Sequence, residues 1–268
     1  MPGRTPESFF RPFQLGPSEL IALVGGGGKT ALLHALALYL FRAGASVLVS
    51  TTTKMNAPRL PGLLLKDSIE DLELLKAVRC TLRRRRLVAL LTSPDGGVGD
   101  KRTGLSPDRT DLLWSARVAS HIVTEADGSR QKPLKAWAEH EPPIPSRTTL
   151  LCAVLGADRM DEPLDEEHVF RLELMERNFG LKRGERLTPD RLALMMNSPA
   201  GGLKNAPAGA RKLLFLNRAD LLPRSRRSDL AARFLPKLAS RLIGWDSLLM
   251  GSLRERRIDV ALTIPLPR

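Results

Sequence analysis

A run of glycines followed by a lysine and a threonine is the part of this chain that points most directly to chemistry. It lies between an apolar segment, residues 20–24, and an Ala/Leu-rich segment from residue 31. Glycines leave backbone N–H groups free to converge on phosphate oxygens, and the N-terminus of a following helix adds partial positive charge. The lysine would neutralise the β and γ phosphates of a nucleoside triphosphate, and the threonine hydroxyl would bind Mg²⁺. We therefore predict a nucleotide-binding loop composed of Gly25, Gly26, Gly27, Gly28, Lys29 and Thr30.

The loop is shorter than the usual phosphate-binding pattern G-x-x-x-x-G-K-[ST]. Leu23 stands six residues before Lys29, so only G-x-x-G-K-T, from Gly25 to Thr30, is present. The alternative is a flexible turn with a solvated lysine. Glycines between a strand-like and a helix-like apolar segment favour the phosphate-binding interpretation. We expect ATP or GTP as the cofactor, together with Mg²⁺.

Two carboxylates in the segment His121–Arg130 are the second candidate for chemistry. Glu125 and Asp127 are two residues apart at the end of an apolar strand-like run. In extended backbone such residues face the same way, and ligands of parallel sheets bind at the carboxyl ends of strands. One carboxylate could hold Mg²⁺ through water while the other polarises a nucleophile; the alternative is a solvated acidic turn. We predict metal ligation by Thr30 and Asp127, and catalytic roles for Lys29, Glu125 and Asp127.

Cations and further acids follow the acidic pair. Arg130, Lys132 and Lys135 could clamp an anionic substrate or the triphosphate. His140 stands between two glutamates and could transfer protons, so it completes the set of catalytic candidates. A surface histidine flanked by acids is the alternative interpretation. No spacing in this segment matches a structural zinc site.

Polar residues also end two other expected strands. Hydroxyls in Ser50–Lys54 could reach Mg²⁺ or a phosphate, although threonine is also simply favoured in strands. The sequence Asn217-Arg218-Ala219-Asp220 resembles the N-K-x-D motif of GTP-binding proteins, with arginine in place of lysine. Asp220 could accept hydrogen bonds from guanine while Asn217 secures the loop. A turn at a helix N-cap explains the same residues without any base.

The composition narrows the classes of partner. The 268 residues carry a formal net charge of +13, with 11 lysines and 31 arginines spread along the chain. Aromatic residues make up 4%, so platforms for base stacking are scarce and we expect no specific nucleic-acid binding. We expect no membrane association, because the longest apolar helical run is too short to cross a bilayer. The absence of an export signal and of a disulfide framework favours a cytoplasmic protein.

Strand-like and helix-like segments alternate, and these must position the candidate residues. Strands are expected near residues 20–24, 46–50, 87–91, 121–124, 150–155, 213–216 and 247–250. Helices are expected near residues 29–42, 68–78, 107–119, 166–178, 189–196 and 228–242. The alternation predicts an α/β, P-loop-NTPase-like fold with a mostly parallel sheet and helices on both faces. We expect one nucleotide-binding domain over residues 1–268, with a flexible or loosely packed segment at residues 1–18.

Several ordered segments together resemble the YqeC-type family of selenium-dependent hydroxylase accessory proteins, or selenium cofactor biosynthesis proteins. The acidic segment with its K-P-L-K and E-H-E-P continuations, at residues 132–135 and 139–142, is the specific part. The glycine loop, the threonines at 51–53 and the N-R-A-D sequence add to it. Gly26 and Ala31 depart from the alanine and second threonine common in the family, and neither change removes a phosphate contact.

The resemblance implies a role in maturing molybdenum hydroxylases that carry a labile selenium atom. We expect an Mg²⁺-dependent nucleotide-binding accessory protein, an NTPase, that assists selenium insertion, with the hydroxylase or its cofactor as partner. The shortened loop is also similar to that of Mur ligases and folylpolyglutamate synthases, which activate a carboxylate as an acyl phosphate. The alternatives are an ATP-dependent ligase or transferase acting on a cofactor precursor, and a non-catalytic adapter switched by nucleotide.

Overall fold

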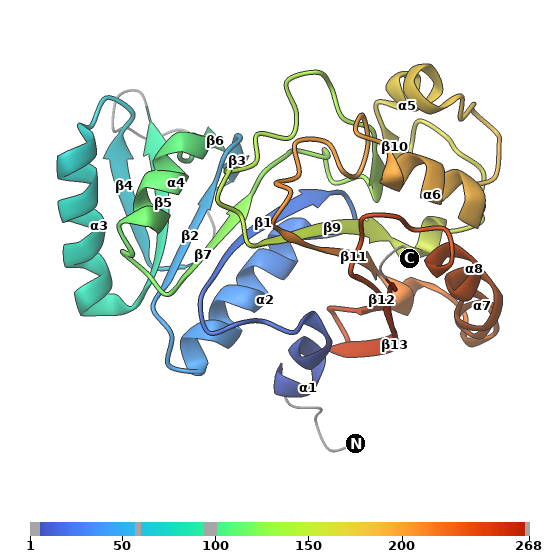
Figure 1. The fold of residues 1–268 in the computed structure, drawn as a ribbon, viewed down its shortest axis with the longest axis horizontal. Helices are drawn as coiled ribbons and strands as arrows, with labels where there is room; N and C mark the ends of the chain where they lie inside the picture. Colours follow the sequence, from blue (N-terminus) through green and yellow to red (C-terminus); the bar gives the residue numbers. More distant parts are fainter. Residues whose placement is uncertain (1–5, 57–59, 94–100, 266–268) are drawn as a thin grey trace.

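The computed structural model describes residues 6–56, 60–93 and 101–265, and nine strands of this part form one sheet (Figure 1). The strand order is β13-β12-β11-β9-β1-β7-β2-β5-β4. Neighbours are parallel except β12 and β13, which pair antiparallel. The strands are β1 (Glu19–Gly25), β2 (Val47–Thr51), β4 (Gly62–Lys66), β5 (Leu87–Ser93), β7 (His121–Glu125), β9 (Leu150–Gly156), β11 (Arg211–Asn217), β12 (Ser247–Ser252) and β13 (Arg257–Thr263).

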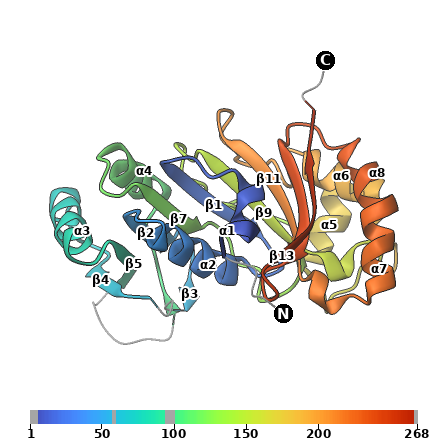
Figure 2. The same cartoon turned by 90° about the horizontal axis from the view of Figure 1, so that it is seen from below.

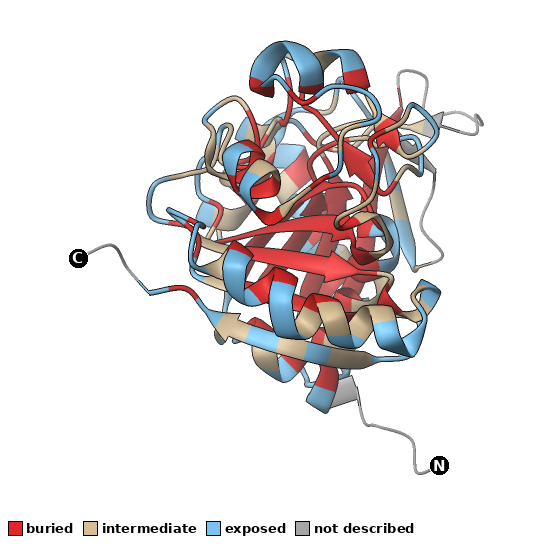
Figure 3. Cartoon of the chain, turned by 90° about the vertical axis from the view of Figure 1, so that its right-hand side faces the viewer, coloured by how far each residue is buried: buried red, intermediate tan, exposed pale blue. Residues whose placement is uncertain are grey.

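Helices cover both faces of this sheet, as the alternating sequence predicts (Figure 2). Alternate residues of β1 enter different cores: Ile21 and Leu23 pack with α2, whereas Ala22 and Val24 face the cluster that holds α5, α6 and α8. Figure 3 shows the buried strands between helices whose outer sides are exposed. The helices are α1 (Pro6–Phe10), α2 (Lys29–Arg42), α3 (Asp71–Arg85), α4 (Pro107–Ser115), α5 (Leu172–Phe179), α6 (Pro189–Asn197), α7 (Arg224–Asp229) and α8 (Leu235–Ala239).

The N-terminal segment is packed where the structure describes it. Phe9, Phe10 and Phe13 are each at most 4% exposed, and the ring of Phe13 lies 5.5 Å from that of Phe215 on β11. The expectation of a loose segment therefore does not hold for residues 9–13. Because these five residues include three phenylalanines, removing their apolar surface from water favours packing of the segment against the core.

Two expected helices differ from the observed elements. The helix expected from residue 166 begins at Leu172, because β10 (Val169–Phe170) pairs with β8 (Leu134–Lys135) just before it. The helix expected over residues 228–242 is divided by a π-helical turn, Leu230–Phe234, and Pro236 follows in the first turn of α8. Proline lacks an N–H group, so it favours this local change of helix type.

Three strand pairings involve strands that the sequence analysis did not expect. β4 pairs with β5 at one edge of the sheet, and β13 pairs with β12 at the other edge. The third pairing joins β3 (Met55–Asn56) and β6 (Lys101–Arg102). The loop expected after residue 93 falls mostly outside the described residues. Within the described ranges, no helix has the length and apolar character needed to span a membrane.

Candidate functional site

The glycine loop lies at the carboxyl end of β1, the strand between β9 and β7. Gly25 has φ +97° and Gly27 has φ +62°, both in the left-handed region that side chains rarely adopt. A Cβ on Gly25 would lie 2.4 Å from Val154 O, and one on Gly27 would lie 2.5 Å from the carbonyl carbon of Leu155. The loop therefore packs directly on β9, and a larger residue at either position would displace backbone.

Three of the four glycine N–H groups predicted to bind phosphate are used inside the protein. Those of Gly25 and Gly26 donate to the Asp127 carboxylate and to Val154 O, the latter at 2.7 Å. Gly25 and Gly26 thus shape the loop, in contrast to the prediction that all four glycines bind the nucleotide. A third N–H, that of Gly27, makes a longer contact of 3.3 Å with the carbonyl of residue 132.

The first turn of α2 keeps its donors available. Leu32 is the first residue of the helix whose N–H donates to a helical carbonyl, that of Gly28 at 3.0 Å. The helical hydrogen bonds therefore begin after the N–H groups of Gly28, Lys29 and Thr30. Within the described part of the chain these three groups have no acceptor. All three residues line a cavity of about 810 Å³. A helix N-terminus with free donors at a cavity is a ready anion site.

Lys29 is turned back on its own loop. Its Nζ donates to Gly25 O at 2.5 Å and lies 3.0 Å from Asp127 Oδ1 and 3.7 Å from Glu125 Oε1. The residue is 3% exposed. The predicted phosphate-binding cation is therefore held by two carboxylates and a carbonyl, at the base of the cavity.

Asp127 is fully buried, and its carboxylate oxygens already have partners. Gly25 N–H donates to both oxygens, at 3.1 and 2.9 Å, and Lys29 adds an ion pair to Oδ1. Lys135 Nζ lies 3.2 Å from Oδ2, which also accepts the indole N–H of Trp137 at 2.7 Å. In contrast to its predicted role as a metal ligand, Asp127 fixes the loop from beneath, because no lone pair is left to face the cavity.

Glu125 is the carboxylate that reaches the cavity. Its Oε2 accepts a 2.7 Å hydrogen bond from Thr30 Oγ1, and both residues line the cavity. Burial raises the pKa of Glu125, while Lys29 and the Thr30 hydroxyl act in the opposite direction. Of the predicted metal ligands, Thr30 thus lines the cavity and Asp127 does not, whereas Glu125 lies beside Thr30 in the cavity wall.

Lys135 and Lys132 do not form the predicted substrate clamp. Lys135 is fully buried, with Nζ 2.7 Å from Gly128 O and 3.1 Å from Glu141 Oε2. Lys132 Nζ donates to the backbone carbonyls of Glu166 and Val169. Lys135 thus stabilises the turn after β7, whereas Lys132 connects the residues before β8 to the segment that leads into β10.

Arg130 and His140 are exposed. Arg130 lines the cavity, and its guanidinium lies 5.2 Å from the ring centroid of Phe170. It is thus the one member of the predicted cation group that faces the same cavity as the glycine loop. His140 is outside the wall of this cavity, whereas the neighbouring Glu141 is buried and contacts Lys135 and Arg171.

Asn217 connects the end of β11 to the glycine loop. Its Nδ2 donates to Gly27 O at 2.7 Å, and its Oδ1 accepts from the N–H of Leu253 at 2.9 Å. This agrees with the predicted role of Asn217 in securing the loop. Asp220 accepts from Ser252 Oγ at 2.7 Å through Oδ1, and its Oδ2 lies 4.0 Å from Arg254.

Two basic residues of the cavity wall were not among the predicted site residues. Arg218 lines it and pairs with Asp158, 3.3 Å away, at the end of β9. Lys54 lines it too, whereas the hydroxyls of Thr51 and Thr52 bond to the carbonyls of residues 125 and 143. The threonines are therefore structural, and the lysine directly after them is the residue that faces the cavity.

These features define the class of the protein: an α/β fold with a mostly parallel sheet, whose carboxyl edge carries a candidate anion site. Residues 21–173 match the family model described as YqeC protein. The chain is similar to the uncharacterized protein YqeC of Escherichia coli (strain K12), with 34% identity over 206 residues that cover 74% of this chain and 75% of the relative. The chain therefore belongs to the YqeC protein family, as its ordered motifs predict.

Proposed function

We propose that this protein binds a nucleoside triphosphate and Mg²⁺ in the 810 Å³ cavity at the end of β1. The observation that carries the proposal is the convergence of free N–H groups of Gly28, Lys29 and Thr30 with the Thr30–Glu125 hydrogen bond. Donors for an anion and oxygen ligands for a hard cation thus face the same cavity. Mg²⁺ keeps several waters and needs few protein carboxylates when phosphates also bind it, so one glutamate and one hydroxyl fit it.

Each residue has a distinct part in this proposal. The first turn of α2 binds phosphate oxygens, and Lys29 exchanges Gly25 O and its carboxylate partners for them. Thr30 and Glu125 would hold Mg²⁺, which neutralises phosphate charge when bound. Asp127 and Lys135 keep the loop and the turn after β7 in place. Arg130 and Lys54 supply further positive charge at the rim.

We place the base near the end of β11. Asn217 and Arg218 line the cavity beside the loop, and Asp220 lines the adjoining cavity. Asp220 keeps Oδ2 without a hydrogen bond within the described residues, so it could accept from guanine. This supports GTP, whereas the shortened loop supports ATP by its similarity to ligases.

The family resemblance supports a biological role. We propose that nucleotide turnover in the cytoplasm assists selenium insertion into a molybdenum hydroxylase, or into its cofactor, as an accessory step. Two other outcomes are ATP-dependent ligation or transfer on a cofactor precursor, and a nucleotide-driven switch without turnover. Single-turnover reactions with γ-³²P-labelled nucleotide, run with and without a candidate precursor, separate them. Hydrolysis releases label as inorganic phosphate without a precursor, ligation releases it only together with the joined product, transfer leaves it in the acceptor, and a switch leaves it in the nucleotide.

Calorimetric titration with ATP and GTP, in Mg²⁺ and in EDTA, tests nucleotide binding. Lys29→Met should abolish measurable affinity, whereas Lys76→Met should leave it unchanged. Lys76 is an exposed lysine on α3, so this control removes the same charge away from the cavity. Equal affinity in the parent protein and Lys29→Met would contradict the proposal.

A further inference from the structure

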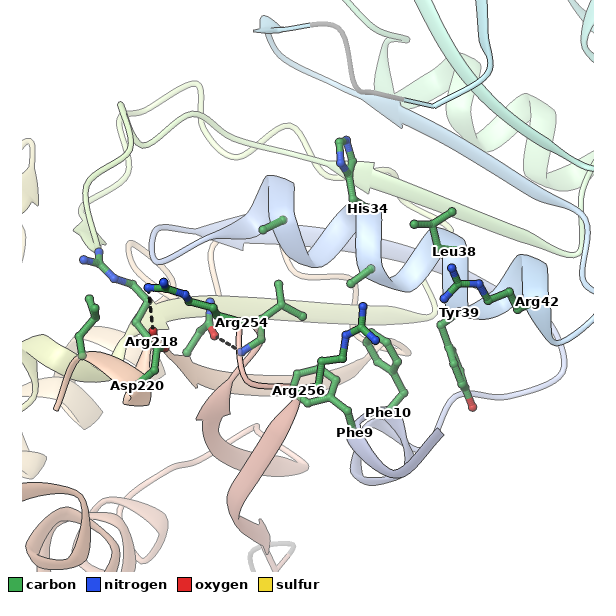
Figure 4. Close-up of a pocket in the computed structure, with 15 residues that line it drawn as sticks. Phe9, Phe10, His34, Leu38, Tyr39, Arg42, Arg218, Asp220, Arg254 and Arg256 are labelled. Atoms are coloured by element: carbon green, nitrogen blue, oxygen red, sulfur yellow. Dashed lines mark hydrogen bonds and ion pairs between the residues drawn. The ribbon is translucent and has the colours of Figure 1, made fainter. Parts of the chain in front are cut away.

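A second cavity adjoins the proposed nucleotide site and extends along α2 (Figure 4). Its volume is about 610 Å³, within the range of small-molecule sites. It shares Ala31, Asn217 and Arg218 with the first cavity. It then continues past these residues to Tyr39 and Arg42, at the other end of the helix.

The floor of this second cavity is apolar and aromatic. Phe10 and Tyr39 lie with ring centroids 4.7 Å apart and a 33° angle between the rings, and Leu38 and Leu253 extend the apolar wall. Phe10 is buried, and Tyr39 is partly exposed. A flat ring of a ligand could stack there, because offset aromatic pairs are favourable beyond the area that they bury.

The rim carries unpaired positive charge. Figure 4 shows Arg42 at the end of α2 and Arg256 from the turn between β12 and β13, with Phe9 and Phe10 nearby. Neither guanidinium has a carboxylate or carbonyl partner within the described ranges. Most other arginines of the site region are paired, as Arg218 is with Asp158. An anionic group of a ligand would pair with these two guanidinium groups.

The far end of the cavity is distant from the predicted phosphate site. From Thr30 to Arg42, α2 rises about 18 Å at 1.5 Å per residue. A nucleotide whose phosphates contact the first turn and whose base contacts Asp220 would leave Tyr39, Arg42 and Arg256 for another molecule. We propose that this cavity binds a second ligand, a small aromatic anion, beside the nucleotide. The two-ligand arrangement rests on the proposed function, whereas the anion site itself does not.

Binding of 8-anilinonaphthalene-1-sulfonate, followed by fluorescence, tests this site. The parent protein should bind one equivalent, and the double variant Arg42→Gln/Arg256→Gln should bind at least about tenfold more weakly because two charge-assisted contacts are lost. The matched control is Arg84→Gln/Arg85→Gln, which removes the same charge from exposed residues at the end of α3. The neutral probe N-phenyl-1-naphthylamine should not distinguish the variants.

Competition with nucleotide separates this proposal from the proposed function. Dye that stays bound at one equivalent of GTP or ATP supports a second ligand, and displacement by a second equivalent would identify that ligand as another nucleotide. Displacement by the first equivalent would overturn the proposal, as would displacement by a single-stranded oligonucleotide. So would the absence of saturable dye binding, or equal affinity in the parent and Arg42→Gln/Arg256→Gln. Arginine-dependent dye binding without nucleotide binding would contradict the proposed function and leave the anion site standing.

Discussion

Lys29 Nζ lies 3.0 Å from Asp127 Oδ1, and both side chains are buried. Lys135 Nζ lies 3.2 Å from the other oxygen of the same carboxylate. The lysine proposed to bind phosphate is therefore also part of an ion cluster beneath the loop. Phosphate binding must replace this internal partner, so substitutions here should affect both stability and affinity.

Lys29→Ala should destabilise the protein by about 1–3 kcal/mol as well as remove nucleotide affinity. The loss is moderate because Asp127 keeps Lys135 and the Gly25 N–H as partners. Urea denaturation of the variant without nucleotide measures it. Lys54→Ala is the control, since this exposed lysine lines the same cavity and should change stability by less than about 0.5 kcal/mol. Equal stability of Lys29→Ala and the parent would contradict the buried position of the lysine.

Asp127→Asn should be more damaging, by about 3–5 kcal/mol. The amide removes the negative charge between two buried lysines and turns one acceptor into a donor that faces Lys29 or Lys135. Denaturation followed by tryptophan fluorescence measures the change, because Trp137 donates to this carboxylate. A stable variant that loses only Mg²⁺-dependent turnover would restore Asp127 to the predicted metal site.

Glu125→Gln should weaken the effect of Mg²⁺ on nucleotide binding by about tenfold, with little loss of stability. The amide oxygen can still accept from Thr30, but it no longer offers a negative charge to the metal. For each protein, titrations in Mg²⁺ and in EDTA give the ratio of the affinity with Mg²⁺ to the affinity without it. This ratio should be lower for the variant, because only the affinity measured in Mg²⁺ should fall. An equal ratio in the parent and the variant would remove Glu125 from the metal site.

The same glutamate should make stability depend on pH. Burial raises the pKa of Glu125, so its contribution to stability is fully present below the ordinary glutamate value of about 4.3 and is lost as pH rises through the raised pKa. The stability of the parent relative to Glu125→Gln should therefore decrease with rising pH across this window. Denaturation of both proteins from pH 4 upward measures the difference. A difference that grows with pH would contradict the raised pKa.

The sequence predicted β1, the glycine loop and α2 correctly, because local residue types determine them. Apolar residues stand before and after the loop, and glycines stand where the backbone of the loop meets that of β9. The sequence placed Glu125 and Asp127 on one side because extended residues two apart face alike. In the structure β7 ends at Glu125, so Asp127 lies beyond the strand and turns under the loop while Glu125 faces Thr30. The point at which a strand ends is set by tertiary packing, which spacing alone does not reveal.

The roles of the lysines were equally hidden from the sequence. Lys135 is buried because Glu141 and Asp127 surround its Nζ, and Glu141 in turn contacts Arg171 from the start of α5. A cation next to acids along the chain can bind a ligand or its own neighbours, and the pattern is the same in both cases. The long-range pairing of β8 with β10 sets Phe170 opposite Lys135 and so brings Arg171 to this cluster.

We expect Asp220 to determine the choice of base. Its Oδ1 accepts from Ser252 Oγ at 2.7 Å, and its Oδ2 has no hydrogen bond within the described residues. If guanine donates to this carboxylate, ATP leaves the acceptor unmet at a cost of about 1–3 kcal/mol, which corresponds to roughly 5- to 150-fold in affinity. Competition binding with GTP, ATP and XTP measures this preference, and Asp220→Asn should abolish it or favour XTP, whose carbonyl at position 2 matches an amide donor.

Ser252→Ala is the matched control for the base experiment. It removes the hydroxyl that orients Asp220 but keeps the carboxylate, so it should reduce the preference for GTP without reversing it. Asn217→Ala should instead lower the affinities for GTP and ATP equally. The Asn217 amide donates to Gly27 O and so holds the glycine loop, which both nucleotides need. Equal affinities of the parent for ATP and GTP would reduce the N-R-A-D sequence to a turn that ties β11 to the glycine loop and to β12.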